Sequence, residues 1–136
     1  MTYFWFATLA CVLMSTTALP RQAPGSFHPI PSDDPHLQPS VNFAAASVNQ
    51  RCNCLFCQTL VAVTNASEKI VSGAVYAFSM SLQESDKCRY SQCTTNVSSS
   101  DCPPNPKAEA YWCDATVLAK PWTSIPYVIQ ELSCWQ

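Results

Sequence analysis

Cysteine supplies the most reactive side chains of this chain, which contains nine cysteines. Cys54 and Cys57 form a C-x-x-C pair, a spacing used by thiol-disulfide enzymes and by zinc sites. A redox motif stands where a strand passes into a helix, whereas strand-forming residues surround this pair. A zinc site needs a second pair of ligands, and no further C-x-x-C or C-x-x-H occurs. We therefore interpret these cysteines as partners in structural disulfides.

Other catalytic or metal-binding patterns are missing from the sequence. His28 and His36 have no partner of metal-ligand type at a useful spacing, so we expect solvated histidines and no metal site. No Ser/His/Asp set and no paired carboxylates point to catalysis, so the sequence predicts neither an enzyme nor a cofactor. The net charge is −2 and no basic stripe occurs, which argues against nucleic acid or a membrane surface as partner. A protein partner is favoured.

The first residues are typical of a secretory signal peptide. Tyr3 to Met14 are uncharged and mostly apolar, and the small residues up to Ala18 suit a signal-peptidase site. No later segment is apolar enough to cross a membrane. We predict a signal peptide at 1–18 and one domain at 19–136. Loss of Cys11 with the signal peptide leaves eight cysteines, an even number that indicates disulfides in a secreted chain.

Two tripeptides match the acceptor pattern for N-glycosylation, which fits an extracellular protein. They begin at Asn65 and Asn96, which are therefore the predicted glycosylation sites. Secretion is the predicted localisation, with an endolysosomal location as the alternative.

The segment from Leu60 to Leu82 predicts a β-hairpin around which the rest of the chain is arranged. Its first half is rich in β-branched residues, and its second half alternates between apolar and small residues, as half-buried strands do. The five residues Lys69-Ile70-Val71-Ser72-Gly73 form the predicted turn. Gly73 is one of only two glycines, and it stands where the backbone needs a positive φ.

Upstream of the hairpin, the sequence predicts an extended arm followed by a helix. Prolines recur in the arm around Gly25, without any apolar period. Apolar residues then recur at helical spacing up to about Arg51, and this stripe needs a sheet to cover. Ser32-Asp33-Asp34-Pro35 is a start signal for this helix. Because Pro39 lies about one turn later, either the first turn is irregular or the helix begins nearer Gln38.

Downstream of the hairpin, a polar stretch from Gln83 to Lys107 predicts a long loop held by disulfides. Two more strands are predicted, at Ala110–Leu118 and Tyr127–Cys134, with a turn that contains Pro121 and Trp122. The tryptophan has two interpretations. Its ring either folds back on the sheet or stands exposed as an interface anchor.

This order of elements resembles the type 2 cystatins, which are secreted inhibitors of papain-like cysteine proteases. Lys69 to Gly73 resembles the Gln-x-Val-x-Gly loop of that family, and Pro121-Trp122 resembles its second hairpin loop. Asn42-Phe43-Ala44 resembles part of the family's helix, and Gly25 matches its glycine in the arm. The resemblance implies an α+β fold in which one long helix packs across a four- to five-stranded antiparallel sheet.

The resemblance also implies a function. The chain would reversibly inhibit papain-like proteases of the cathepsin type by filling the active-site cleft with a tripartite wedge. The implied contact residues are Gly25, Lys69, Ile70, Val71, Ser72, Gly73, Pro121 and Trp122. Lys69 replaces the usual glutamine, and Ala23 and Pro24 replace a branched apolar pair, so we expect a smaller contribution from the arm. A non-inhibitory, secreted cystatin-fold protein for binding or defence is the alternative.

Further site residues follow from the same resemblance. It implies the disulfides Cys88–Cys102 and Cys113–Cys134, and it leaves Cys52, Cys54, Cys57 and Cys93 unassigned. A disulfide between the helix-strand junction and Cys93 is one alternative, and a disulfide between two chains is another. A monomer and a domain-swapped or disulfide-linked dimer are therefore the alternatives. Asn53 matches the asparagine with which some members inhibit legumain-type proteases, which makes legumain a second candidate partner.

Overall fold

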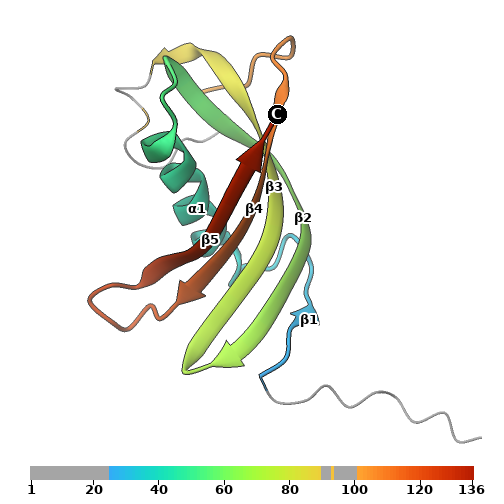
Figure 1. The fold of residues 1–136 in the computed structure, drawn as a ribbon, viewed down its shortest axis with the longest axis vertical. Helices are drawn as coiled ribbons and strands as arrows, with labels where there is room; N and C mark the ends of the chain where they lie inside the picture. The colour runs from blue at the N-terminus through green and yellow to red at the C-terminus, as the bar shows by residue number, and fades with distance from the viewer. Residues whose placement is uncertain (1–24, 90–92, 94–100) are drawn as a thin grey trace, which may run out of the picture.

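The computed structural model describes residues 25–89, 93 and 101–136, and the predicted signal peptide lies outside them. Within these residues, one helix lies across one face of a five-stranded antiparallel sheet (Figure 1). The strands follow one another in the order β1-β2-β3-β4-β5. The predicted α+β fold is therefore confirmed. No helix in the described part of the chain is long and apolar enough to cross a membrane.

Strands β2 (Phe56–Val71) and β3 (Gly73–Arg89) form the predicted hairpin. The turn is shorter than the sequence predicts, because Val71 already pairs with Gly73 and only Ser72 lies between the strands. β-branched Ile70 and Val71 favour extended backbone, so pairing continues to the tip. The register between β2 and β3 shifts at three places: between Phe56 and Gln58, between Leu60 and Ala62, and between Thr64 and Ser67.

The prediction that the chain leaves the sheet at Gln83 is wrong. β3 continues to Arg89, and Glu84 pairs with Gln58 of β2. Two disulfides that end in this part of the hairpin, Cys57–Cys93 and Cys88–Cys102, supply the burial that its polar sequence lacks. A backbone with satisfied hydrogen bonds and cross-links can remain a strand without an apolar period.

Helix α1 spans Gln38–Arg51, so the later of its two predicted starts is confirmed. Pro39 lies in the first turn, where its missing N–H removes no helical hydrogen bond. The predicted apolar stripe is buried in the core: Leu37 at the N-cap, and Val41, Ala44 and Val48 within the helix.

The opposite side of the core comes from β3 and β4 (Ala110–Ala119), and the sheet ends with β5 (Tyr127–Trp135). Every second residue of β3 is buried beneath the helix, as the alternation predicts; these residues are Tyr76, Phe78, Met80 and Leu82. Each such side chain stabilises the fold by about 1.5–3 kcal/mol. The two predicted strands after the loop are confirmed to within a residue.

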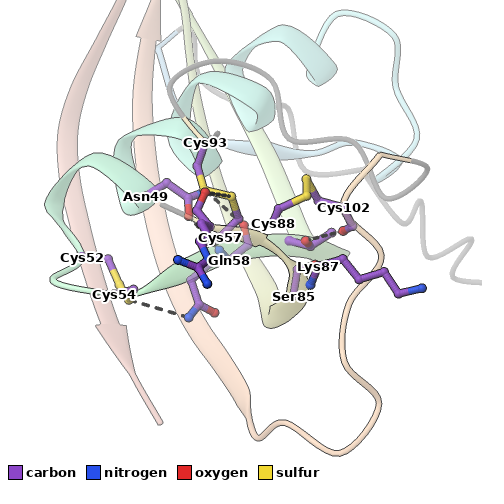
Figure 2. The surroundings of a disulfide bond; sticks show 12 residues. Asn49, Cys52, Cys54, Cys57, Gln58, Ser85, Lys87, Cys88, Cys93 and Cys102 are labelled. Atoms are coloured by element: carbon purple, nitrogen blue, oxygen red, sulfur yellow. Dashed lines mark hydrogen bonds between the residues drawn. A yellow bond between two sulfur atoms is a disulfide. The ribbon is translucent and has the colours of Figure 1, made fainter. Parts of the chain in front are cut away.

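Asn49 fastens the last turn of α1 to the start of β2. Its Oδ1 accepts a hydrogen bond from the backbone N–H of Gln58 at 2.7 Å, and its Nδ2 donates to the carbonyl of the same residue at 3.0 Å. Figure 2 shows the two residues side by side, next to the disulfides. This contact between helix and strand fixes where the chain enters the sheet.

Four disulfides link the eight cysteines of the described residues. Cys88–Cys102 and Cys113–Cys134 are the pairs that the resemblance implies. The extra cysteines form Cys57–Cys93 and Cys52–Cys54, so the two members of the C-x-x-C pair have different partners. Cys57, Cys88, Cys93 and Cys102 form a second buried cluster (Figure 2). Beside it, the Thr59 hydroxyl donates to the Cys102 carbonyl at 2.6 Å.

Candidate functional site

The candidate site is the end of the sheet where the β2–β3 turn, the β4–β5 loop and the arm come together (Figure 1). The turn contains Ser72, the loop contains Pro121 and Trp122, and the arm leads from Gly25 into β1 (His28–Pro29). These are the three segments that carry the sequence-predicted contact residues. The fold therefore places them at one end, although the sequence separates them widely.

Gly73 lies where the two hairpin tips meet. Its φ is +106°, a conformation that favours glycine. A Cβ on it would stand 2.5 Å from the carbonyl oxygen of Ala119 and 2.8 Å from Cγ of Lys120. It would also lie 3.4 Å from Cη2 of Trp122. The missing side chain is thus what allows the first tip to approach the second.

The first tip presents apolar side chains to solvent. Ile70 is 57% exposed, Val71 is 39% exposed, and Ser72 beside them is exposed as well. Lys69 is half-buried instead, with its Nζ 5.2 Å from the ring centroid of Phe27. The charge of the first tip therefore lies on an aromatic ring, beside the apolar residues.

Trp122 of the second tip is 67% exposed, as one of its two interpretations expects, although Cη2 of its ring also lies close to Gly73. Its role as an interface anchor stays a prediction. Hydrogen bonds within the loop keep its shape. The Thr123 N–H donates to the Lys120 carbonyl at 2.9 Å, and the Lys120 N–H donates to the Pro126 carbonyl at 2.7 Å. The Thr123 hydroxyl lies 2.7 Å from the Lys120 carbonyl. The loop is therefore folded before any partner binds.

A pocket of about 530 Å³ opens between the start of α1 and the two tips. Its walls are largely aromatic side chains and prolines, among them Tyr76, Pro121, Trp122 and Tyr127. The sequence alone does not predict this pocket, because its walls come from the helix start and from both hairpins. It widens the apolar surface next to Trp122.

The arm is anchored to the edge of the sheet just after Gly25. Gly25 itself has a φ of +84°, and a Cβ there would meet no atom within 4 Å. His28 pairs with Glu68 in the β1–β2 ladder, and the Ile30 N–H donates to the Ala66 carbonyl at 3.0 Å. The His28 Nε2 also lies 3.6 Å from a Glu68 carboxylate oxygen. The arm is thus held by pairing with β2 from His28 onward.

Tyr76 connects the arm anchor to the core. Burial, with the negative charge of Glu68 next in importance, raises the pKa of the Tyr76 phenol to about 12. The phenol is therefore protonated at neutral pH and donates a hydrogen bond to the Glu68 carboxylate. Glu68 faces the Tyr76 hydroxyl and the His28 imidazole together.

The remaining predicted residues lie elsewhere. Asn53 is exposed in the connection between α1 and β2, beyond the end of β2 that is opposite the candidate site. Asn65 is exposed at a register shift in β2, with a φ of +52°. Asn96 lies outside the described residues. Among the described residues, no group of three or more histidine, cysteine or acidic side chains could hold a metal ion.

A single helix across an antiparallel sheet, with two hairpin tips and an arm at one end, defines the cystatin class of fold. A family model described as the cystatin domain matches residues 25–122. The chain therefore belongs to the cystatin family. Members of this family are protease inhibitors and not enzymes, in agreement with the sequence prediction.

Comparison with individual proteins agrees with this assignment. Cystatin-1 of Crotalus adamanteus is 27% identical over 120 residues, which cover 85% of this chain and 86% of that protein. The structure of dimeric human cystatin F matches with a TM-score of 0.72 at 21% identity, covering 90% of this chain and 95% of that chain. A salivary cystatin from the soft tick Ornithodoros moubata matches with a TM-score of 0.67 at 20% identity. The match covers 84% of this chain and 100% of that chain.

Proposed function

We propose that the chain is a secreted, type 2 cystatin that reversibly inhibits papain-like cysteine proteases of the cathepsin type. The observation that carries this proposal is the approach of Gly73 to Trp122, which joins the two hairpin tips next to the arm. Membership of the cystatin family supports a protease as the partner.

Inhibition in this proposal is occlusion of the active-site cleft. Ile70 and Val71 of the first tip and Trp122 of the second supply exposed apolar area for the cleft walls. Strand pairing and loop hydrogen bonds hold both tips in shape, so docking costs little conformational entropy. Trp122 is the expected hot spot, because large exposed aromatic residues dominate interfaces. No bond of the inhibitor is cut, so the inhibitor dissociates intact.

Gly25 is the proposed hinge of the arm, and the residues before it would enter the substrate subsites. Its positive φ and the open space around it suit a change of direction. Ala23 and Pro24 offer less apolar area to a subsite than branched residues would. We therefore expect the hairpin tips to contribute more to affinity than the arm does.

A second proposed activity, toward legumain-type proteases, uses the other end of β2. Asn53 is exposed between Cys52 and Cys54, whose disulfide closes a short ring around it. Such a ring presents one side chain in a restricted backbone. Asn53→Ala should abolish legumain inhibition and leave papain inhibition unchanged, since the two ends are independent. Loss of both activities would contradict separate sites.

The competing function is that of a non-inhibitory cystatin-fold protein, secreted for binding or defence. Lys69 favours it, because a glutamine is usual at the corresponding position of the family's loop. The contact of Lys69 with Phe27 favours inhibition instead, since it takes the charge away from the exposed Ile70 and Val71.

Secretion and oligomeric state are part of the proposal. Residues 1–18 suit a signal peptide, and structural disulfides persist in oxidising compartments. All eight cysteines of the described residues are paired within the chain, which favours a monomer over a disulfide-linked dimer. Sedimentation of the oxidised protein separates a monomer from a domain-swapped dimer.

The deciding experiment is a titration of papain and of cathepsin L with the refolded, oxidised protein. We expect inhibition at near-stoichiometric amounts and full recovery of activity on dilution. Reduced and alkylated protein is the control, because it keeps the sequence and loses the cross-linked fold. Protease activity that survives micromolar inhibitor would overturn the inhibitory function and leave the non-inhibitory one.

A further inference from the structure

Two consecutive residues of the arm, Phe27 and His28, contact side chains on opposite faces of β2. Phe27 contacts Lys69, and His28 contacts Glu68, which precedes Lys69 in the strand. We propose that Lys69 is a positioning residue of the inhibitor: by holding Phe27 it fixes the direction in which the arm leaves the sheet at Gly25. This inference rests on the proposed function, and it adds which residue sets the direction of the arm.

The contact between Phe27 and Lys69, the outer contact, lies on the sheet face away from the helix. Lys69 pairs with Val75, whose neighbour Tyr76 points into the core beneath the helix. Val75 nevertheless is only 4% exposed, so other side chains must cover it on the outer face. Phe27 and Lys69 line the same hollow of about 300 Å³ as Val75, and they are placed to do so. The ring and the lysine stem are therefore among the side chains that adjoin Val75 on this face.

The charge of Lys69 is used in this contact. Its Nζ lies 5.2 Å from the Phe27 ring centroid, within the range in which an ammonium is attracted to the face of an aromatic ring. Glu131 of β5 lines the same hollow. A glutamine at position 69 could cover Val75 in part, but it would lose the attraction of the cation.

The inner contact, between His28 and Glu68, prevents the arm from rotating about the outer contact. His28 pairs with Glu68 in the ladder, and its Nε2 lies 3.6 Å from the Glu68 carboxylate, which also accepts the Tyr76 hydrogen bond. The Ile30 N–H is bonded to the Ala66 carbonyl at 3.0 Å. Because adjacent arm residues hold adjacent strand residues on both faces, the arm cannot slide or turn without breaking both contacts. Gly25, where a side chain would meet no atom within 4 Å, lies just before these contacts.

The first test measures the anchor in the free protein, without any protease. A mutant cycle compares the wild type with Lys69→Gln, Phe27→Leu and the double variant; leucine keeps apolar cover over Val75 and removes the aromatic ring. We expect each single variant to speed amide exchange at Ile30 by about two- to fivefold, the range that corresponds to an exposed cation–π contact. The double variant should exchange no faster than the faster single variant.

Two controls separate the charge from general damage. Lys69→Arg keeps a cation and should retain the protection of Ile30, whereas Lys107→Gln removes an exposed lysine elsewhere and should change nothing. In NMR spectra, the side-chain protons next to the Lys69 ammonium should show a ring-current shift that disappears in Phe27→Leu. An unchanged exchange rate in Lys69→Gln, or no ring-current shift in the wild type, would overturn the anchor.

The second test asks whether the anchor serves inhibition. Lys69→Gln and Phe27→Leu should each raise the inhibition constant for papain by about two- to fivefold, without adding in the double variant. Additive effects, or unchanged constants despite faster exchange at Ile30, would overturn the positioning role while wild-type inhibition stands. If the wild type does not inhibit, the proposed function fails and the positioning role fails with it, but the exchange cycle still decides whether the anchor exists.

Discussion

Cη2 of the Trp122 indole lies close to Gly73, so that the tips of the two hairpins adjoin each other. A Cβ on Gly73 would stand 3.4 Å from Cη2 of the indole and only 2.5 Å from the carbonyl oxygen of Ala119. The two tips are therefore in contact in the free protein. This contact explains why a glycine and an exposed tryptophan, 49 positions apart, belong to the same site.

Gly73→Ala should destabilise the fold and weaken inhibition together. The new Cβ meets a backbone carbonyl, and the φ of +106° is strained for alanine, so we expect the free energy of unfolding to fall by about 3 kcal/mol. Gly25→Ala is the matched control, with a φ of +84° and open space around it. The strain of a positive φ still applies at Gly25, so Gly25→Ala should lose about 1–2 kcal/mol and Gly73→Ala more, because only at position 73 does the Cβ also meet a backbone carbonyl. Equal losses in urea unfolding would contradict the close approach of the tips.

Asn49→Ala should be among the most destabilising changes outside the apolar core. It leaves the backbone N–H and carbonyl of Gln58, which are buried, without their partner. Each such group costs about 1–3 kcal/mol, so we expect a loss of about 2–4 kcal/mol. Asn42→Ala, at an exposed position of the same helix, is the control. Similar urea midpoints for the two variants would show that Asn49 does not join helix and strand.

Stability should fall at alkaline pH through Tyr76. The pKa of its phenol is about 12 in the folded chain and near 10 when unfolded, so folding favours the protonated form. The stabilisation is present in full below about pH 10 and is lost as the pH rises through about 12. Tyr76→Phe should abolish this part of the pH dependence. In a titration followed by tyrosinate absorbance, the variant should lack one phenol that ionises at high pH in the wild type. A phenol at position 76 that titrates near pH 10 would contradict the burial beside Glu68.

The two additional disulfides should differ in what they contribute. Cys57–Cys93 closes a separation of 36 residues, and Cys52–Cys54 a separation of only 2. Chain-entropy arguments give about 4 kcal/mol for the first and about 1 kcal/mol for the second. Replacing each pair by alanine, with urea unfolding as the measurement, should reproduce this order. Equal losses, or a disulfide map of the wild type with other pairs, would contradict the assignment.

Much of this architecture could be predicted from local patterns. The alternation from Tyr76 to Leu82 gave the buried face of β3, and the stripe from Leu37 to Val48 gave the buried face of α1. Gly73 could be placed in a turn because few other residues adopt its φ. The spacing of apolar residues and the backbone preference of a residue are local properties, so a single sequence is enough to recognise them.

What the sequence could not predict depends on contacts between distant residues. β3 continues through a polar stretch to Arg89 because cross-links and the pairing with β2 support it. The partner of Cys93 was open, since spacing does not decide among pairings. The pocket beside Trp122 and the contact of Phe27 with Lys69 arise only when the arm, the helix and both hairpins are assembled.

The central claim is that the joined hairpin tips are the surface that enters the protease cleft. The most direct measurement compares the inhibition constants of Trp122→Ala and Ile125→Ala for papain. Both side chains are 67% exposed in the same loop, so both changes should leave the free energy of unfolding nearly unchanged. Trp122→Ala should raise the inhibition constant at least 30-fold, about 2 kcal/mol for a hot spot, and Ile125→Ala by less than about fivefold. An unchanged constant for Trp122→Ala, with wild-type inhibition intact, would contradict the account.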